Sequence, residues 1–142
     1  IGYIHAKKEF ITQMNKMHIP MAICAPVVSQ YAALGALEGP QDCIEKFRNH
    51  YDKVRKTMCN RLSRLDQVFD YQIPKGAYLM FPGIKHPEGR NSLDFAKKLL
   101  REARVSATPG IAFQGESHLR MSFCVPEEMV NKAFDRMEKY FS

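Results

Sequence analysis

Residues 41–66, QDCIEKFRNHYDKVRKTMCNRLSRLD, form the stretch of sequence that decides the architecture of this chain. Gly39-Pro40 precedes the stretch, and Asp42 lies where a carboxylate in the first turn complements the helix dipole. Apolar residues then recur at steps of three or four, which is the period of an amphipathic helix. They are Ile44, Phe47, Tyr51, Val54, Met58, Leu62 and Leu65. A helix over residues 41–66 would be about 39 Å long, so we expect it to bridge two domains.

The residues after position 66 alternate between strand and helix patterns. Strand patterns cover the apolar run Ala77–Phe81, the short Val105–Ala107 and the alternating His118–Cys124. Ser92 is a candidate cap for one helix, and Pro126 begins another. This order predicts a small α/β sandwich. The residues expected to face its core are Phe95, Ala96, Leu99, Leu100, Ala103, Leu119, Met121, Phe123, Met129, Ala133, Phe134, Met137 and Phe141.

The residues before position 40 carry two further helix patterns. We expect a short strand at Ile1–Ile4, then a helix that ends at a break at Ile19-Pro20. Residues 26–37, PVVSQYAALGAL, are almost without charge, so a helix there would be apolar nearly all round. We therefore expect that helix to be buried on every side.

The composition is that of a globular protein and excludes several classes. Hydrophobic residues make up 45% and charged residues 25% of the 142 residues, and no apolar run is long enough to span a membrane. The net charge of +6 is diffuse, with 10 Lys/Arg against 7 Asp/Glu in residues 1–70 and 11 against 8 in residues 71–142. We therefore expect neither a nucleic acid nor a membrane as a partner. Because the chain begins at Ile1 rather than Met, we expect it to be part of a longer protein.

The four cysteines show no spacing typical of a zinc site, and no histidine stands at ligand spacing from them. We therefore expect no metal. Scattered thiols in apolar surroundings are typical of the core of a cytosolic protein. The four are Cys24, Cys43, Cys59 and Cys124.

Arg120 is the first candidate for a functional residue, because it lies in mid-strand between Leu119 and Met121. One interpretation is an edge-strand arginine that faces solvent. The other is a guanidinium held on a sheet to bind a carboxylate through two parallel hydrogen bonds, which the ammonium of a lysine cannot form. The residues alone leave both open. Glu116 and His118 are either an acid/base pair or solvated loop residues, and the second is more common.

Six motifs follow one another along nearly the whole chain. They are Ile1-Gly2-Tyr3, Ser29-Gln30-Tyr31-Ala32-Ala33-Leu34, Tyr51-x-x-x-Arg55, Pro74-x-Gly76-Ala77-Tyr78-x-x-Phe81-Pro82, Pro109-Gly110-x-x-Phe113 and Leu119-Arg120-Met121-Ser122-Phe123. In this order they resemble the carboxyl-terminal part of the class I/II, aspartate aminotransferase-like enzymes of pyridoxal-phosphate fold type I. The resemblance implies an α/β fold: residues 1–40 end a large cofactor domain, residues 41–66 form a long interdomain helix, and residues 67–142 form a small carboxyl-terminal domain.

The resemblance also implies a function, the transfer of an amino group between an amino acid and a 2-oxo acid. The cofactor would be pyridoxal 5'-phosphate, and the enzyme a cytoplasmic homodimer. By the same resemblance, Arg120 matches the arginine that binds the substrate's α-carboxylate. Gln114 stands where a glycine is usual, in a loop that is shorter than in many members, so the lid loop is expected to differ in shape.

The Schiff-base lysine of the family precedes the position of Ile1, and none of the twelve lysines here takes its place. We therefore expect no catalytic residue in this chain and no activity from the chain alone. The alternatives are a related fold type I lyase, racemase or decarboxylase, and a non-catalytic binding or dimerisation fragment.

Overall fold

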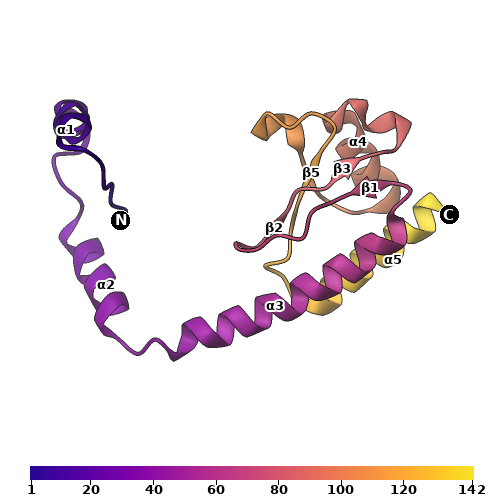
Figure 1. The fold of residues 1–142 in the computed structure, drawn as a ribbon, viewed down its shortest axis with the longest axis horizontal. Coiled ribbons are helices and arrows are strands. Elements are labelled where there is room, and N and C mark those ends of the chain that lie inside the picture. Colours follow the sequence, from indigo (N-terminus) through magenta and orange to yellow (C-terminus); the bar gives the residue numbers. More distant parts are fainter. The chain divides into compact units, whose positions relative to one another are not determined.

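The computed structural model describes residues 1–142, which form two compact units, Ile1–Cys43 and Ile44–Ser142. The first unit contains helix α1 (Lys8–Ala22) and helix α2 (Val27–Glu38) (Figure 1). The second unit contains nearly all of helix α3, all five strands and the helices α4 and α5.

The start of the first unit corrects two predictions. Residues Ile1–Ile4 pair with no strand, because the first unit contains none, so the predicted strand is wrong. Pro20 lies inside α1, which continues past the predicted break to Ala22. A proline so close to the end of a helix removes one hydrogen bond of the last turn without ending the helix before it.

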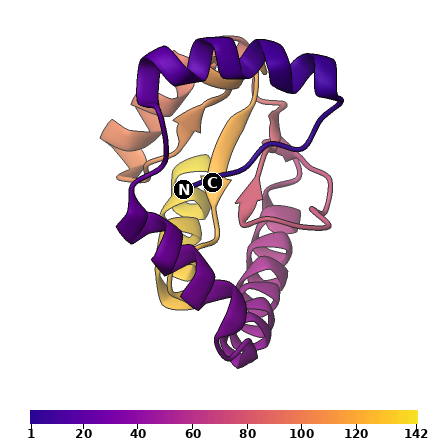
Figure 2. The ribbon, with the colours of Figure 1, turned by 90° about the vertical axis from the view of Figure 1, so that its left-hand side faces the viewer.

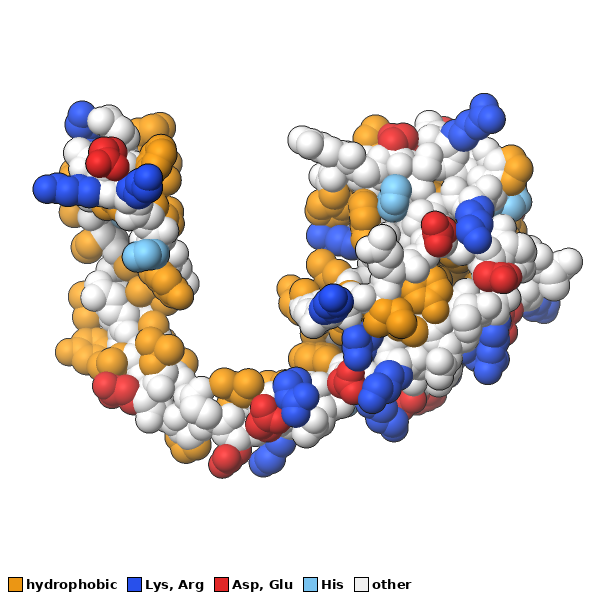
Figure 3. Space-filling model, viewed as in Figure 1, with side chains coloured by type: hydrophobic (Ala, Val, Ile, Leu, Met, Phe, Trp, Pro, Cys, Tyr) orange, Lys and Arg blue, Asp and Glu red, His pale blue; other side chains and the backbone are white.

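Neither helix of the first unit buries a residue. The exposed fraction reaches 81% for Val28 and 80% for Leu37, and Figure 3 shows hydrophobic side chains along both helices. The helix predicted over residues 26–37 is therefore present as α2, but the residues of this unit do not bury it on any side.

The long amphipathic helix is confirmed as α3 (Asp42–Leu62), which a 3-10 turn at Ser63–Leu65 continues. The second half of its apolar stripe is buried, with Val54 and Leu62 both 0% exposed. In the first half, Ile44 is 54% and Phe47 is 57% exposed. The stripe therefore has one covered and one uncovered half.

Two small antiparallel sheets build the second unit. Strand β5 (Leu119–Ser122) lies between β2 (Leu79–Met80) and β4 (Thr108–Pro109). Strand β1 (Phe69–Asp70) pairs with β3 (Gly83–Ile84), and a single bridge joins Gly83 to His118 just before β5. The predicted α/β class is confirmed.

Two predicted strands are shortened or displaced. Only β2 remains of the run Ala77–Phe81, because Ala77 has a φ of 60°, outside the β region. The strand predicted at Val105–Ala107 lies instead at β4. The reason is that the Val105 N–H donates to the Leu99 carbonyl and so closes the preceding helix.

Helices α4 (Ser92–Lys98) and α5 (Glu127–Phe141) complete the second unit, and a π-helical turn at Leu99–Ala103 extends α4. In both ribbon views α5 runs beside α3 (Figures 1 and 2), where Arg61 of α3 forms ion pairs with Asp135 and Glu138 of α5.

Two residues predicted to face the core are exposed instead. Leu100 is 51% exposed because the wider π-helical turn shifts it off the buried stripe. Met129 is 55% exposed because it lies in the first turn of α5, beside the buried Val130 but on another face.

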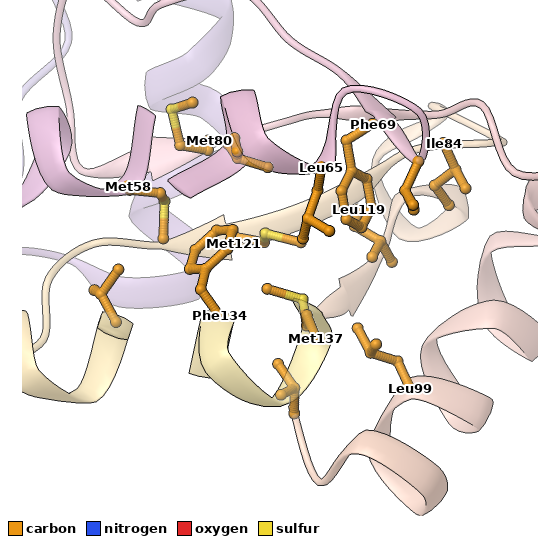
Figure 4. Close-up of a cluster of buried hydrophobic side chains, with 14 of the residues drawn as sticks. Met58, Leu65, Phe69, Met80, Ile84, Leu99, Leu119, Met121, Phe134 and Met137 are labelled. Carbon is orange, nitrogen blue, oxygen red and sulfur yellow. The ribbon is translucent and has the colours of Figure 1, made fainter. Parts of the chain in front are cut away.

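One cluster of buried side chains joins the helices and strands of the second unit (Figure 4). Strand β5 contributes alternate residues to it, and its exposed fractions are 0% at Leu119, 7% at Met121 and 1% at Phe123 just beyond the strand. The predicted alternation is therefore confirmed, and it turns the residues between these three toward the other face of the sheet.

The cysteines correct a further prediction. All four are free thiols, but only Cys59 is buried, so the predicted core position is wrong for Cys24, Cys43 and Cys124. No group of three or more His, Cys, Asp or Glu residues is arranged to hold a metal ion. The structure has no helix with the length and apolar character needed to cross a membrane.

Candidate carboxylate-binding site

Arg120 lies on the central strand β5, opposite Thr108 of β4. Strand β5 pairs with β2 on one side and with β4 on the other, so the interpretation of Arg120 as an edge-strand residue is wrong. Its neighbours Leu119 and Met121 are buried in the core. The pairing and the packing together fix the backbone at Arg120, and its half-buried side chain stands on the opposite face of the sheet.

Phe113 supports the guanidinium of Arg120. The Cζ atom of Arg120 lies 4.1 Å from the centroid of the Phe113 ring, a cation–π contact. None of the ion pairs in the chain includes Arg120. An aromatic ring does not satisfy the N–H donors of a guanidinium. The forked set of donors of Arg120 is therefore available to an external anion.

The loop Gly110–His118 carries Phe113 and closes on itself. The Gly110 N–H donates to the His118 carbonyl at 2.8 Å, and the Gly115 N–H donates to the Gly110 carbonyl at 3.0 Å. A Cβ atom at Gly110 would lie 2.0 Å from the Gly115 carbonyl oxygen, so the loop needs glycine there. Gln114 has a φ of 59°, so this loop keeps a backbone conformation that favours glycine.

Helix α4 anchors this loop through two hydrogen bonds. The Ser92 N–H donates to Oε1 of Glu116 at 2.6 Å, and the Ile111 N–H donates to Oγ of Ser92 at 3.1 Å. The hydrogen bond from the Ser92 backbone holds the pKa of Glu116 below its ordinary value of 4.5. The helix cap predicted at Ser92 belongs to Asn91, whose side chain accepts two N–H groups of the first turn. Ser92 itself is fully buried under the loop.

Glu116 and His118 do not form a side-chain acid/base pair. Nδ1 of His118 lies 2.9 Å from the backbone carbonyl oxygen of Glu116, and since a carbonyl only accepts, Nδ1 carries the proton. The imidazole ring stacks on Phe81, with centroids 4.9 Å apart and planes 13° from parallel. Both residues therefore order the loop that carries Phe113.

A second polar cluster surrounds a cavity of about 410 Å³ between α3 and the turn after Pro74. Arg55 donates to the Pro74 carbonyl at 2.7 Å and to Oδ1 of Asp52 at 2.5 Å. Lys56 and Arg55 hold the pKa of Asp52 below its ordinary value of 3.8. Because the arginine has partners in the chain, the cluster fastens the turn to α3 and leaves Arg120 as the better anion-binding candidate.

The groups that hold Arg120 in place could not be predicted from the sequence. The strand position of Arg120 indicated a functional residue, but Phe113 stood out only as a member of a motif, and the predicted helix cap at Ser92 lies one residue after the cap in the structure. The Ser92–Glu116 contact joins residues 24 positions apart, so no local pattern records it. Gly110 and Gly115, which flank Phe113 in the sequence, were the one available signal of a tight loop.

The lysines of the chain do not fit the role of a cofactor-bearing lysine. None of them is buried, and only Lys98 is half-buried. Its hydrogen bond to Glu88 raises the pKa of Lys98. A lysine that attacks an aldehyde must first lose its proton, so it needs a lowered pKa. No lysine of the chain therefore has the buried surroundings that this role requires.

Residues 1–137 match the family model for aminotransferase class I and II. The chain therefore belongs to this family. It is 36% identical to the aspartate aminotransferase of Pyrococcus abyssi, over 98% of this chain and 36% of that protein. It is 33% identical to the aromatic-amino-acid aminotransferase 2 of Thermococcus litoralis, over 98% of this chain and 36% of that protein.

Solved structures of the family share the fold. The crystal structure of an aromatic aminotransferase from Pyrococcus horikoshii superposes with a TM-score of 0.83 at 34% identity, over 96% of this chain and 37% of that one. The chain thus spans little more than a third of the length of the relatives it matches.

Proposed function

We propose that this chain supplies the substrate-carboxylate-binding part of a pyridoxal phosphate-dependent aminotransferase. The reaction is the transfer of an amino group between an amino acid and a 2-oxo acid. Family membership and the names of the two relatives support this reaction class. The observation that carries the proposal is Arg120, an arginine without an ion pair on a central strand, with a ring on one side and free donors.

The geometry suits the two substrates of this reaction equally. An amino acid and a 2-oxo acid both carry a carboxylate next to the carbon that exchanges its nitrogen. One arginine can therefore hold both by two parallel hydrogen bonds. Strand pairing fixes the backbone at Arg120 and Phe113 supports its guanidinium before the substrate arrives, so binding orients the reacting carbon at a small cost in ordering. Pyridoxal phosphate, when bound, supplies the electron sink for the bond changes at that carbon.

We also propose the domain roles implied by the resemblance. Residues 1–40 end the large cofactor domain, residues 41–66 form the interdomain helix, and residues 67–142 form the small domain. The uncovered apolar side chains of α2 and of the first half of α3 support this assignment, since such surfaces are usually covered in the folded enzyme. The same surfaces support a homodimer, and four free thiols support a cytoplasmic enzyme.

The test is Arg120→Lys in the pyridoxal phosphate-loaded enzyme that contains this chain. We expect kcat/KM for amino acids to fall by about 30-fold to several thousand-fold, because the ammonium keeps the charge but loses the fork. The melting temperature should stay within a few degrees of the parent's, since the side chain stands outside the core. Parent-like kinetics in this variant would remove the carboxylate-binding role.

The products separate this reaction from its alternatives. An aminotransferase leaves a 2-oxo acid and a new amino acid, whereas an eliminating lyase releases ammonia, a decarboxylase releases carbon dioxide and a racemase inverts the α-carbon. We expect one equivalent of new amino acid for each 2-oxo acid formed. Ammonia or carbon dioxide in that amount would contradict the proposal.

A further inference from the structure

We infer that His118 is a positioning residue for Arg120, acting through the rings of Phe81 and Phe113. The inference rests on the proposed carboxylate-binding role of Arg120. Three contacts make a continuous row. The His118 ring stacks on Phe81 at 4.9 Å, Phe81 meets Phe113 edge to face at 6.3 Å and 88°, and Phe113 lies 4.1 Å from Cζ of Arg120.

The row begins and ends on one segment of backbone. His118 and Arg120 are two residues apart, so the pleat of the strand turns both side chains to the same face. Phe81 follows β2, and Phe113 comes from the loop before β5. The rings thus bridge three separate elements on the face of the sheet opposite the core.

The two ends of the row differ in how firmly they are held. His118 has its Nδ1–H on the Glu116 carbonyl and its backbone paired with Gly83 and Gly110. Arg120 has a fixed backbone, but none of the side-chain hydrogen bonds of the chain holds its guanidinium, which rests on Phe113. The position of the guanidinium therefore depends on the position of that ring.

The rings between them need support from both sides. Phe81 is 42% and Phe113 is 43% exposed, so the core does not enclose either. Close packing against the loop backbone holds Phe81 on one edge, since a Cβ atom at Gly115 would lie 2.5 Å from its Cζ. The flat face of Phe81 is covered by His118. Without that imidazole, Phe81 can turn, and Phe113 and the guanidinium lose their support.

The direct test measures the side chain of Arg120 by NMR in the 142-residue chain. The parent chain should show an order parameter for the Arg120 Nε–H bond above about 0.6, and His118→Ala should lower it below that value. His118→Phe keeps a flat ring and should restore the parent value. His118→Asn keeps a donor for the Glu116 carbonyl but has no ring, so it should behave like His118→Ala.

His86→Ala is the matched control. The His86 ring lies against Phe95 and Phe141, away from the row, so its removal should leave the order parameter of Arg120 unchanged. The amide spectrum and the melting temperature of each variant show whether the second unit is folded. If His118→Ala does not fold, the comparison of His118→Asn with His118→Phe decides the same question.

A parallel test uses the loaded enzyme. His118→Ala should raise KM for amino acids by about 2- to 10-fold, the usual effect of having to order one long side chain, with kcat nearly unchanged. His118→Phe should return KM to the parent value. A purely structural histidine would instead lower the amount of active enzyme and leave KM as it was.

The outcomes separate the inference from the proposed function. If the Arg120 side chain is as rigid in His118→Ala and His118→Asn as it is in the parent chain, the inference is overturned and the carboxylate-binding role is unaffected. A mobile Arg120 in these variants would support it, even if Arg120→Lys showed parent-like kinetics and so overturned the carboxylate role alone.

Discussion

Oε1 of Glu116 lies 2.6 Å from the backbone nitrogen of Ser92, so a carboxylate fastens the loop that carries Phe113 to the first turn of α4. The same helix end binds the loop a second time, through the Ser92 hydroxyl and the Ile111 N–H. A carboxylate near a helix amino terminus also meets the positive end of the helix dipole. The support of Arg120 therefore reaches back to α4.

Acid should loosen this contact. Because the pKa of Glu116 is lowered in the folded chain, its stabilising effect is full above the ordinary value of 4.5 and is lost as the pH falls through the lowered pKa. Glu116→Gln should therefore have a lower melting temperature than the parent at pH 7, and the difference should shrink toward pH 3. Glu38→Gln, at an exposed residue without an ion pair and at the carboxyl end of a helix, is the control. An equal difference at both pH values would contradict the prediction.

Phe134 should dominate the packing of α5. Its side chain is 1% exposed, so Phe134→Ala should lower the free energy of unfolding by about 3–5 kcal/mol. Met129→Ala on the same helix should cost less than about 1 kcal/mol, because Met129 is 55% exposed. Urea unfolding, followed by the helical circular dichroism signal, measures both. Similar losses for the two variants would contradict the core described above.

Gln114→Gly should stabilise the loop. The φ of 59° strains a residue with a Cβ atom, and glycine relieves that strain by more than it gains in unfolded-state freedom. We expect a gain of about 0.5–1 kcal/mol in the free energy of unfolding. Gln72→Gly, at an exposed loop residue with ordinary φ, should lose stability instead. A loss in both variants would show that residue 114 is not strained.

The 142-residue chain should associate through α2. Val28 and Leu37 expose about four-fifths of their surface on a helix that has no charge before its last residue. Sedimentation should show dimers or larger species at high concentration, and Val28→Glu with Leu37→Glu should return the chain to a monomer. Gln30→Glu adds a charge at a polar position and should have a smaller effect. A parent chain that stays monomeric would contradict this prediction.

The helices of the second unit could be predicted from the sequence because their apolar residues recur at helical spacing and this spacing marks the buried face. The residues Val54, Met58 and Leu62 in α3, and Val130, Phe134 and Met137 in α5, stand at helical spacing and are buried. The ends of strands could not be predicted in this way. Ala77 has the positive φ of a turn residue. In the sequence, however, an apolar residue in a turn cannot be distinguished from an apolar residue in a strand.

The candidate site could be predicted only in part. A cation between two apolar strand residues identified Arg120, because alternation of polar and apolar residues survives in the sequence. The side chains that support Arg120 could not be predicted from the sequence. The rings of Phe81 and Phe113 meet only after the strand and the loop have folded, and both were visible only as members of motifs.

Two glycines of the loop set a limit on redesign of the site. A side chain at Gly110 would collide with the loop's own backbone, and one at Gly115 would collide with Phe81. A library that randomises the loop should therefore lose most members changed at these two positions. Ile111, Ala112 and Gln114 are exposed and can vary, whereas Phe113 is needed beside Arg120. New substrate preferences would then have to come from the three side chains that flank Phe113, on a loop whose backbone path is fixed.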